Sequence, residues 1–399
     1  MKRPFVILLA IASCMIGVYS CSEFEPPVPA DDKVLDGPVA GLTMTQSLLH
    51  AKGDAAFTNQ VFTSSTGLGP IFVATSCVSC HAGDGKGHPF TTLTRFGQTD
   101  STGNHFLDQG GPQLQNRAIP GYLPEQIPAG ANFAKFTPPG NTGLGFLELV
   151  PDSDILAMAD PNDADGDGIS GVPNYNNLPG FVSPFPDAIP RGGKFICRFG
   201  KKAAVYSLLQ QTVNAYNQDI GITSVFFPTD VYSGLITEPE ISAQTVNDVV
   251  FYLQTLKTPV QRNKNDETIL HGSQVFINLG CERCHRQALT TGYSPVDALS
   301  HKQISPYTDL LLHDMGPGLD DGYTEGGAKT YEWRTPPLWG LGLTPNSTGG
   351  HYYLLHDGRA TGLEVAIQLH GGEAANSASN FNGLSQSDRV ALIKFLESL

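Results

Sequence analysis

The stretch CERCH, Cys281 to His285, decides how this chain is interpreted. Two thiols three positions apart with a histidine directly behind them fit half of a zinc site, a dithiol redox centre, or the attachment point of a covalent haem. The same pattern occurs a second time as CVSCH, Cys77 to His81. We therefore expect the chain to build one kind of site twice.

The separation of the two motifs distinguishes these chemistries. About 200 residues lie between them, whereas two CxxC halves of a zinc site normally close within tens of residues. A thioredoxin-type dithiol lies at a strand-to-helix turn, a context that neither flank supplies. A c-type haem needs one motif by itself, because the two sulfurs bond to the vinyl groups and the adjacent histidine ligates the iron. The sequence predicts two covalently bound c-type haems, with these attachment residues and proximal ligands: Cys77, Cys80, His81, Cys281, Cys284 and His285.

A helical pattern far behind each motif indicates an internal repeat. Residues 241–256 and 384–399 align without gaps, and each stretch has a serine suited to N-capping followed by apolar residues at i, i+3, i+4 and i+7. With 44 glycines and 29 prolines, the rest of the chain should be rich in loops. We predict a mainly α fold with two cytochrome c-like helical haem domains in tandem, at 44–258 and 266–399. A linker would span 259–265, and the first domain would carry a long insertion.

The N-terminus indicates export. Residues 1–20 combine a basic start, a short apolar run and small residues before Cys21, which is the pattern of a signal peptide. The end of this segment, VYSC, resembles a lipoprotein processing box, so we expect Cys21 to be lipidated, with ordinary cleavage nearby as the alternative. Residues 21–43 are acidic and Pro-rich, as in a flexible tether. The expected location is the periplasm or outer surface of a Gram-negative-type bacterium, with a lipid anchor as the sole membrane attachment.

Charge and cysteine content narrow the partners. The formal net charge of −14 argues against nucleic acid and favours a basic electron donor, such as a small redox protein or a quinol-linked carrier. Outside the signal segment and the two motifs, one cysteine remains, Cys197 in KFICRFG. We predict that it is a small buried apolar side chain.

Several stretches together resemble the bacterial di-haem oxidoreductase family, described as peroxidases or thiol oxidoreductases and related to di-haem cytochrome c peroxidases. From about residue 56 onward they include GLGPIFVATSCVSCHAGDGKG, DADGDGISGVPN, GCERCHRQALTTG, YTDLLLHDMGPGLDDG, WRTPPLWGLGL and LLHDGRATGLEVAIQLHGGEA. The resemblance implies two helical haem domains facing a shared interface, with peroxide reduced at one haem by electrons relayed through the other. A non-catalytic electron-transfer cytochrome, and an oxidase of an organic or protein substrate, stay open as alternatives.

The sixth iron ligand decides what each haem does. Peroxidase relatives carry a methionine just before the histidine of a PYMHDG-like stretch, but this chain has Leu355 there. Leucine cannot ligate iron, so Met315 becomes the candidate distal ligand, with core packing as its alternative role. For His313, His356 and His370 we expect structural hydrogen bonding rather than ligation.

Peroxide chemistry also needs a proton shuttle. Glu148 lies in an apolar run where burial would raise its pKa, and its placement resembles that of the acidic residue of peroxidase relatives. We predict it as the distal acid/base, with a helix-capping role as the alternative. Arg334 and Arg359 are expected to pair with haem propionates or carboxylates. Trp333 and Trp339 could bridge electron transfer or pack against the haems.

The stretch DADGDGISG follows the opening of a calcium loop, with Asp163, Asp165 and Asp167 as oxygen donors. Its twelfth position is Asn174 rather than glutamate, which excludes an orthodox EF-hand. The pattern predicts a one-off calcium loop here, and the resemblance adds support, because relatives hold a calcium ion between their haems. An Asp/Gly turn without metal is the alternative.

Overall fold

The computed structural model describes residues 29–100 and 102–399. The predicted signal peptide and the lipidation site Cys21 lie outside the described residues. None of the helices within the described ranges is both long and apolar enough to cross a membrane. Of the stretch predicted as a tether, the described part contacts the body of the protein, since Pro38 bridges Leu256 and the Leu35 side chain is buried.

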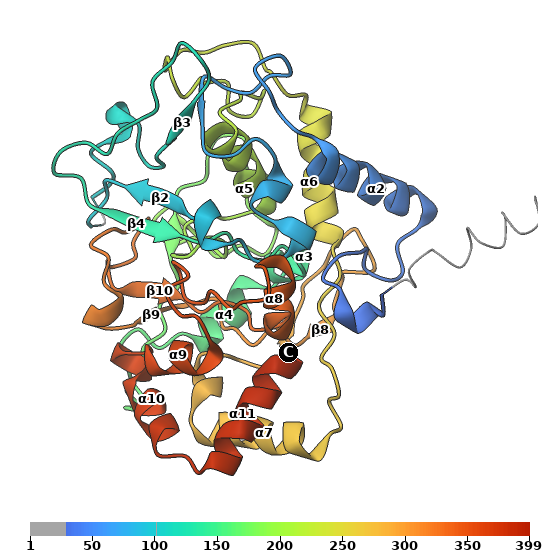
Figure 1. Ribbon diagram of the computed structural model, residues 1–399, viewed down its shortest axis with the longest axis vertical. Helices are drawn as coiled ribbons and strands as arrows, with labels where there is room; N and C mark the ends of the chain where they lie inside the picture. Colours follow the sequence, from blue (N-terminus) through green and yellow to red (C-terminus); the bar gives the residue numbers. More distant parts are fainter. Residues whose placement is uncertain (1–28, 101) are drawn as a thin grey trace, which may run out of the picture.

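The described residues form short helices and shorter strands joined by long loops (Figure 1). The α-helices are α2 (Met44–Asn59), α3 (Leu144–Glu148), α4 (Asp152–Met158), α5 (Leu208–Asn214), α6 (Ala243–Thr255), α7 (Glu267–Asn278), α8 (Thr344–Ser347), α9 (Leu363–Gln368), α10 (Ala375–Asn382) and α11 (Gln386–Ser398). The strands are β1 (Ile71–Phe72), β2 (Leu93–Phe96), β3 (Arg117–Ala118), β4 (Phe133–Phe136), β5 (Tyr175–Asn176), β6 (Phe195–Ile196), β7 (Leu289–Thr290), β8 (Gln303–Ile304), β9 (Leu312–Asp314) and β10 (Glu332–Arg334).

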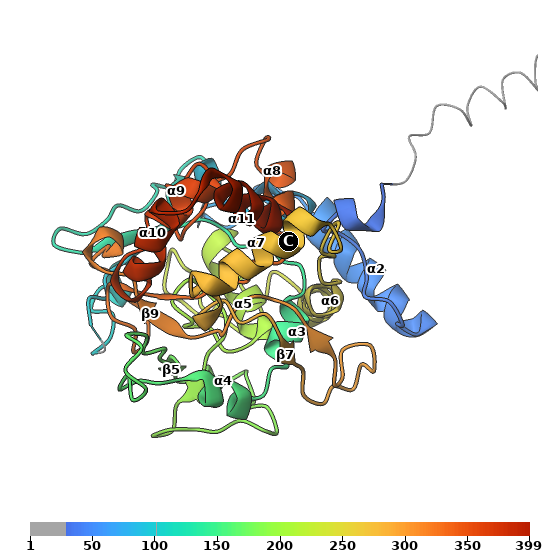
Figure 2. The same ribbon diagram turned by 90° about the horizontal axis from the view of Figure 1, so that it is seen from below.

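Two helix pairs repeat one packing arrangement at opposite ends of the molecule, α2 with α6 and α7 with α11 (Figures 1 and 2). In the first pair, a Cβ on Gly53 would lie 2.0 Å from the carbonyl oxygen of Asp248. In the second pair, a Cβ on Gly272 would lie 2.0 Å from the carbonyl oxygen of Ala391. The two contact positions, 248 and 391, are 143 residues apart, and so are the starts of the two aligned stretches, 241 and 384. The structure therefore has the register of the predicted repeat.

The repeat extends to the motif histidines. One turn after each crossing glycine, a phenylalanine faces the histidine of the following motif. The ring centroids of Phe57 and His81 are 6.2 Å apart, and those of Phe276 and His285 are 6.4 Å apart. Each helix pair therefore supports one motif in the same way.

The prediction of a mainly α fold is wrong. Only 33% of the protein is helical and 11% is strand, which makes it a mixed fold with small sheets. All five sheets within the described residues are two-stranded and antiparallel, pairing β1 with β3, β2 with β4, β5 with β6, β7 with β8, and β9 with β10. Strands of two to four residues are too short to produce the alternating pattern by which a strand is recognised.

The apolar core joins segments that are far apart in the sequence. The larger cluster packs side chains of α5 and α6 against Leu289, Ile304 and Leu311, which follow the second motif. A second cluster fills the space around α7, α9 and α11. A third cluster packs Phe136 of β4 against Trp333 of β10. These contacts hold both motifs against one shared interior.

Candidate haem-binding cavity

One continuous cavity reaches both CxxCH motifs. All six predicted attachment and ligand residues line it: Cys77, Cys80, His81, Cys281, Cys284 and His285. Its walls are mainly apolar, with side chains of α5 and α6 near the first motif and side chains of α9 and α11 near the second. The structure thus brings together two motifs that are about 200 residues apart in the sequence.

The motif cysteines are neutral thiols in the structure. Each motif forms a single helical turn in which the histidine N–H donates to the carbonyl of the first cysteine at 3.0 Å. Burial raises the pKa of Cys77 to about 12 and that of Cys80 to about 11. Metal-binding and redox-active cysteines have a depressed pKa, so these surroundings do not suit a thiolate site.

Both motif histidines are half-buried and favour the neutral form. Burial lowers the pKa of His81 to about 4 and that of His285 to about 4. The Nδ1–H of His285 donates to the Tyr307 carbonyl at 2.9 Å, which leaves Nε2 available as a ligand atom. The Nδ1 of His81 is buried without a well-aligned hydrogen bond in the described chain, although the nearby Pro139 carbonyl opposes the effect of burial on its pKa.

A polar cluster lines the cavity beside the first motif. Asp219 ends a π-helical turn, Ala215–Asp219, that continues α5. Its carboxylate accepts a hydrogen bond from Gln113, whose Oε1 accepts one from Arg95 at 3.3 Å. Arg95 also forms an ion pair with Glu325. Burial raises the pKa of Asp219 to about 6, even though the bond from Gln113 lowers it. Sequence reasoning missed this cluster, because its members come from four separate segments and no motif marks them.

Glu148 does not face the cavity. It lies in α3 and is only 4% exposed. Its Oε1 accepts from the backbone N–H of Leu208 at 2.7 Å, and its Oε2 accepts from Gln254 at 2.7 Å. Glu148 therefore ties the start of α5 to α6, which is the capping alternative rather than the role of acid/base.

Besides Arg95, three cations line the cavity from three segments: Lys86, Lys201 and Arg334. Among the described residues, no carboxylate lies within 4.0 Å of any of them. Burial lowers the pKa of Lys86 to about 8 and that of Arg334 to about 10, and it lowers the pKa of Lys201 well below the usual value. All three side chains are half-buried, and positive charge partly withdrawn from water favours an anionic partner, so this cluster fits an anionic ligand. Arg359, by contrast, already pairs with Asp357 and Asp321.

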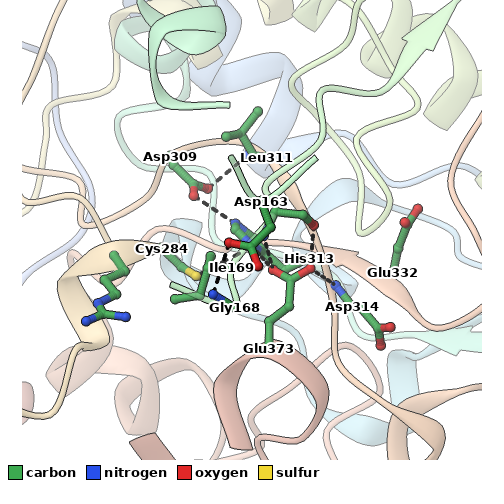
Figure 3. A network of polar contacts seen from close by, with 12 residues as sticks. Asp163, Gly168, Ile169, Cys284, Asp309, Leu311, His313, Asp314, Glu332 and Glu373 are labelled. Atoms are coloured by element: carbon green, nitrogen blue, oxygen red, sulfur yellow. Dashed lines mark hydrogen bonds and ion pairs between the residues drawn. The ribbon is translucent and has the colours of Figure 1, made fainter. Parts of the chain in front are cut away.

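His313 on β9 is enclosed by carboxylates (Figure 3). Its Nε2 lies 2.8 Å from Asp309 and its Nδ1 lies 2.7 Å from Glu373. These bonds raise the pKa of His313 well above its usual value, against the effect of burial. Glu373 also accepts from the Ser170 hydroxyl at 2.5 Å. Both ring nitrogens of His313 are therefore engaged, and the Sγ of Cys284 lies 3.6 Å from the ring.

The predicted calcium loop contacts the second motif. Carboxylates of Asp160, Asp163 and Asp165 lie within 4.8 Å of one another and could hold a metal ion. Asp167, the third predicted donor, instead forms an ion pair with Arg283 of CERCH at 3.3 Å. The donor set thus differs from the predicted one, and calcium binding stays a prediction.

The remaining predicted residues have defined surroundings. Both tryptophans line the cavity. The Trp333 ring stacks on His356 with centroids 3.6 Å apart and lies under the Lys202 ammonium. The Trp339 ring packs on Gly143, where a Cβ would lie 2.5 Å from the ring. As predicted, Cys197 is a buried thiol with 1% exposure.

Residues 136–399 match the family described as "Di-haem oxidoreductase, putative peroxidase". The match covers most of the chain, which therefore belongs to this family and is expected to hold two haem groups. CERCH lies inside the matched range and CVSCH lies before it. No curated protein sequence matches the chain.

Among solved structures, a xenon-pressurised hydrazine synthase of Kuenenia stuttgartiensis aligns with 94% of each chain, at 13% identity and a TM-score of 0.43. This likeness is too remote to transfer an activity. The residues of the cavity do fit two haems, since it offers neutral, half-buried histidines, apolar walls and cations that lack carboxylate partners.

Proposed function

We propose that the protein is a c-type di-haem oxidoreductase that reduces peroxide beside the first motif with electrons that enter at the second. The observation that carries this proposal is the unequal lining of the shared cavity. Beside Cys77 and Cys80 the carboxylate of Asp219 lines the cavity. Beside Cys284 the carboxylates of Asp309 and Glu373 are bonded to His313 and do not line it, and the lining side chains of α9 and α11 there are apolar. Peroxide cleavage needs proton transfer, and electron relay does not.

The chain would hold its cofactors through the two motifs. Thioethers would form at the four cysteines, and His81 and His285 would ligate the irons. Lys86, Lys201 and Arg334 would bind the propionates, because they supply half-buried positive charge from the wall that the two motifs share. When bound, the haems supply electron transfer and reductive cleavage of the peroxide O–O bond.

Proton movement would depend on Asp219. Its raised pKa of about 6 leaves it mainly ionised at neutral pH, yet able to accept a proton from peroxide and return it to the departing oxygen. Gln113 fixes the orientation of this carboxylate through its hydrogen bond. The positive charge of Arg95, beside Gln113, favours anionic oxygen in the cavity.

Export and a lipid anchor at Cys21 are part of the same proposal, and the N-terminal sequence supports them. The net charge of −14 supports a basic redox protein as the electron donor.

The test is peroxide consumption by the purified holoprotein with a chemically reduced donor. We expect turnover that depends on His81 and falls in Asp219→Asn. Incorporation of both haems, measured by the intact mass of each variant, is the control. If fully loaded protein shows no peroxide turnover but exchanges electrons with a redox protein, the non-catalytic cytochrome is the better description. Turnover that requires an organic or protein substrate would favour the oxidase.

A further inference from the structure

An iron held by His285 would need a sixth ligand from the lining of the cavity, and the resemblance to peroxidase relatives puts Leu355 where their methionine would lie. Leu355 lines the cavity but offers no donor atom. Histidine and methionine are the usual axial ligands of c-type haems, and those that line the cavity in the segment after CERCH are His313, Met315, His356 and His370.

The environments of three of these side chains make them poor ligands. Carboxylates engage both nitrogens of His313. The Nε2 of His356 bonds to Asp321 at 2.7 Å, and its ring is stacked flat on Trp333. The Met315 side chain packs against the apolar cluster that contains Trp333, which is the core-packing role given above as its alternative.

His370 differs from these three. It follows the end of α9, and its Nδ1–H donates to the Ala366 carbonyl at 2.7 Å. The structure assigns no hydrogen bond to its Nε2 within the described ranges. This is the arrangement of His285, in which a bond from Nδ1–H to a backbone carbonyl orients the ring and leaves Nε2 for the metal.

The backbone after His370 fixes its position. A Cβ on Gly371 would lie 2.7 Å from the Met315 carbonyl oxygen, and one on Gly372 would lie 2.1 Å from that of Asp314. Only glycines allow this close approach, and Gly372 also has a positive φ of 53°. The double glycine therefore anchors the His370 end of α9 against β9. His370 and His285 line the same cavity.

We infer that His370 is the second axial ligand of the iron held by His285. This inference rests on the proposed function, because it requires a haem at the second motif. Coordination by two imidazoles fills both axial positions, so peroxide would find no open site there. Methionine ligation raises the reduction potential of a haem, so a pair of histidines sets a lower potential that favours passing electrons on to the first motif.

The test is electron paramagnetic resonance of the ferric holoprotein in four forms: the natural chain, His370→Ala, His370→Met and Met315→Leu. We expect the natural chain and Met315→Leu to show the same low-spin signal of a haem with two imidazole ligands. In His370→Ala this signal should be lost and a second cyanide-binding haem should appear. His370→Met should restore a low-spin iron with a higher midpoint potential and the sulfur-to-iron charge-transfer band.

An unchanged low-spin signal in His370→Ala would overturn the assignment, as would its loss in Met315→Leu. Intact mass establishes that each variant carries two haems, and the exposed His301→Ala is the matched control for a histidine replacement. Peroxide turnover of the natural chain is measured in parallel. If turnover is absent while the low-spin signal responds as expected, the peroxidase proposal fails and the His370 ligand stands. If turnover occurs but the low-spin signal is unchanged in His370→Ala, only the ligand assignment fails.

Discussion

Asp219 is the residue at which the reaction should be most sensitive to pH. Because its pKa is raised to about 6, the carboxyl accepts protons above this pH and is protonated below it. We expect peroxide turnover to fall as the pH is lowered through about 6. In Asp219→Asn we expect a rate about 10²-fold lower and no such fall at acidic pH. The measurement is the pH profile of kcat/KM. Glu148→Gln, which changes a carboxylate outside the cavity, should still show the fall in kcat/KM at acidic pH. If Asp219→Asn has the same pH profile as the natural chain, the assignment is contradicted.

Lys201 should act on the reduction potential. Removing a cation beside the bound haems disfavours the electron-rich reduced state, so Lys201→Met is expected to lower a midpoint potential. A partly screened charge is worth about 1.4 kcal/mol, which corresponds to about 59 mV for one electron. Spectroelectrochemical titration measures the shift, with the exposed Lys302→Met as the control. Equal potentials in both variants and the natural chain would show that Lys201 does not contact the propionates.

At the scale of the elements, the glycine crossings hold each helix pair together. Gly272→Ala would push a methyl group to 2.0 Å from the Ala391 carbonyl oxygen, and backbone cannot move aside as a flexible side chain can. We expect a loss of about 3 kcal/mol in the free energy of unfolding, measured by denaturant titration. The control is Gly180→Ala, where a Cβ meets nothing within 4 Å. A similar stability for both variants would mean that the helices separate at little cost.

The terminal helices could be predicted from the sequence because their signals are local. Ser242 and Ser385 cap α6 and α11 as expected, each accepting a hydrogen bond from the backbone three residues on. In α5, which begins at Leu208, Ser207 provides the cap in the same way. The strands could not be predicted, because pairs such as β9 with β10 form between segments far apart and are too short to show a periodic pattern.

At the scale of the whole molecule, the motifs predicted the cofactor and left its surroundings undetermined. The CxxCH spacing is a contiguous signal, so the six candidate attachment residues could be predicted from the sequence, and in the structure all six line one cavity. The cluster around Asp219 was not, because folding assembles Arg95, Gln113 and Glu325 from distant loops. Glu148 is the opposite case. Its place in an apolar run predicted a role in the cavity, but its carboxylate instead accepts the backbone N–H of Leu208 at the start of α5.

The shared cavity makes the central claim testable as a difference between two haems in one protein. The most direct measurement is a cyanide titration of the purified ferric and half-reduced protein, followed by its optical and spin-state spectra. We expect one haem per chain to stay low-spin throughout and the other to bind cyanide and to react with peroxide. If the irons of both haems stay low-spin in every redox state and neither binds cyanide or peroxide, the protein is not a peroxidase.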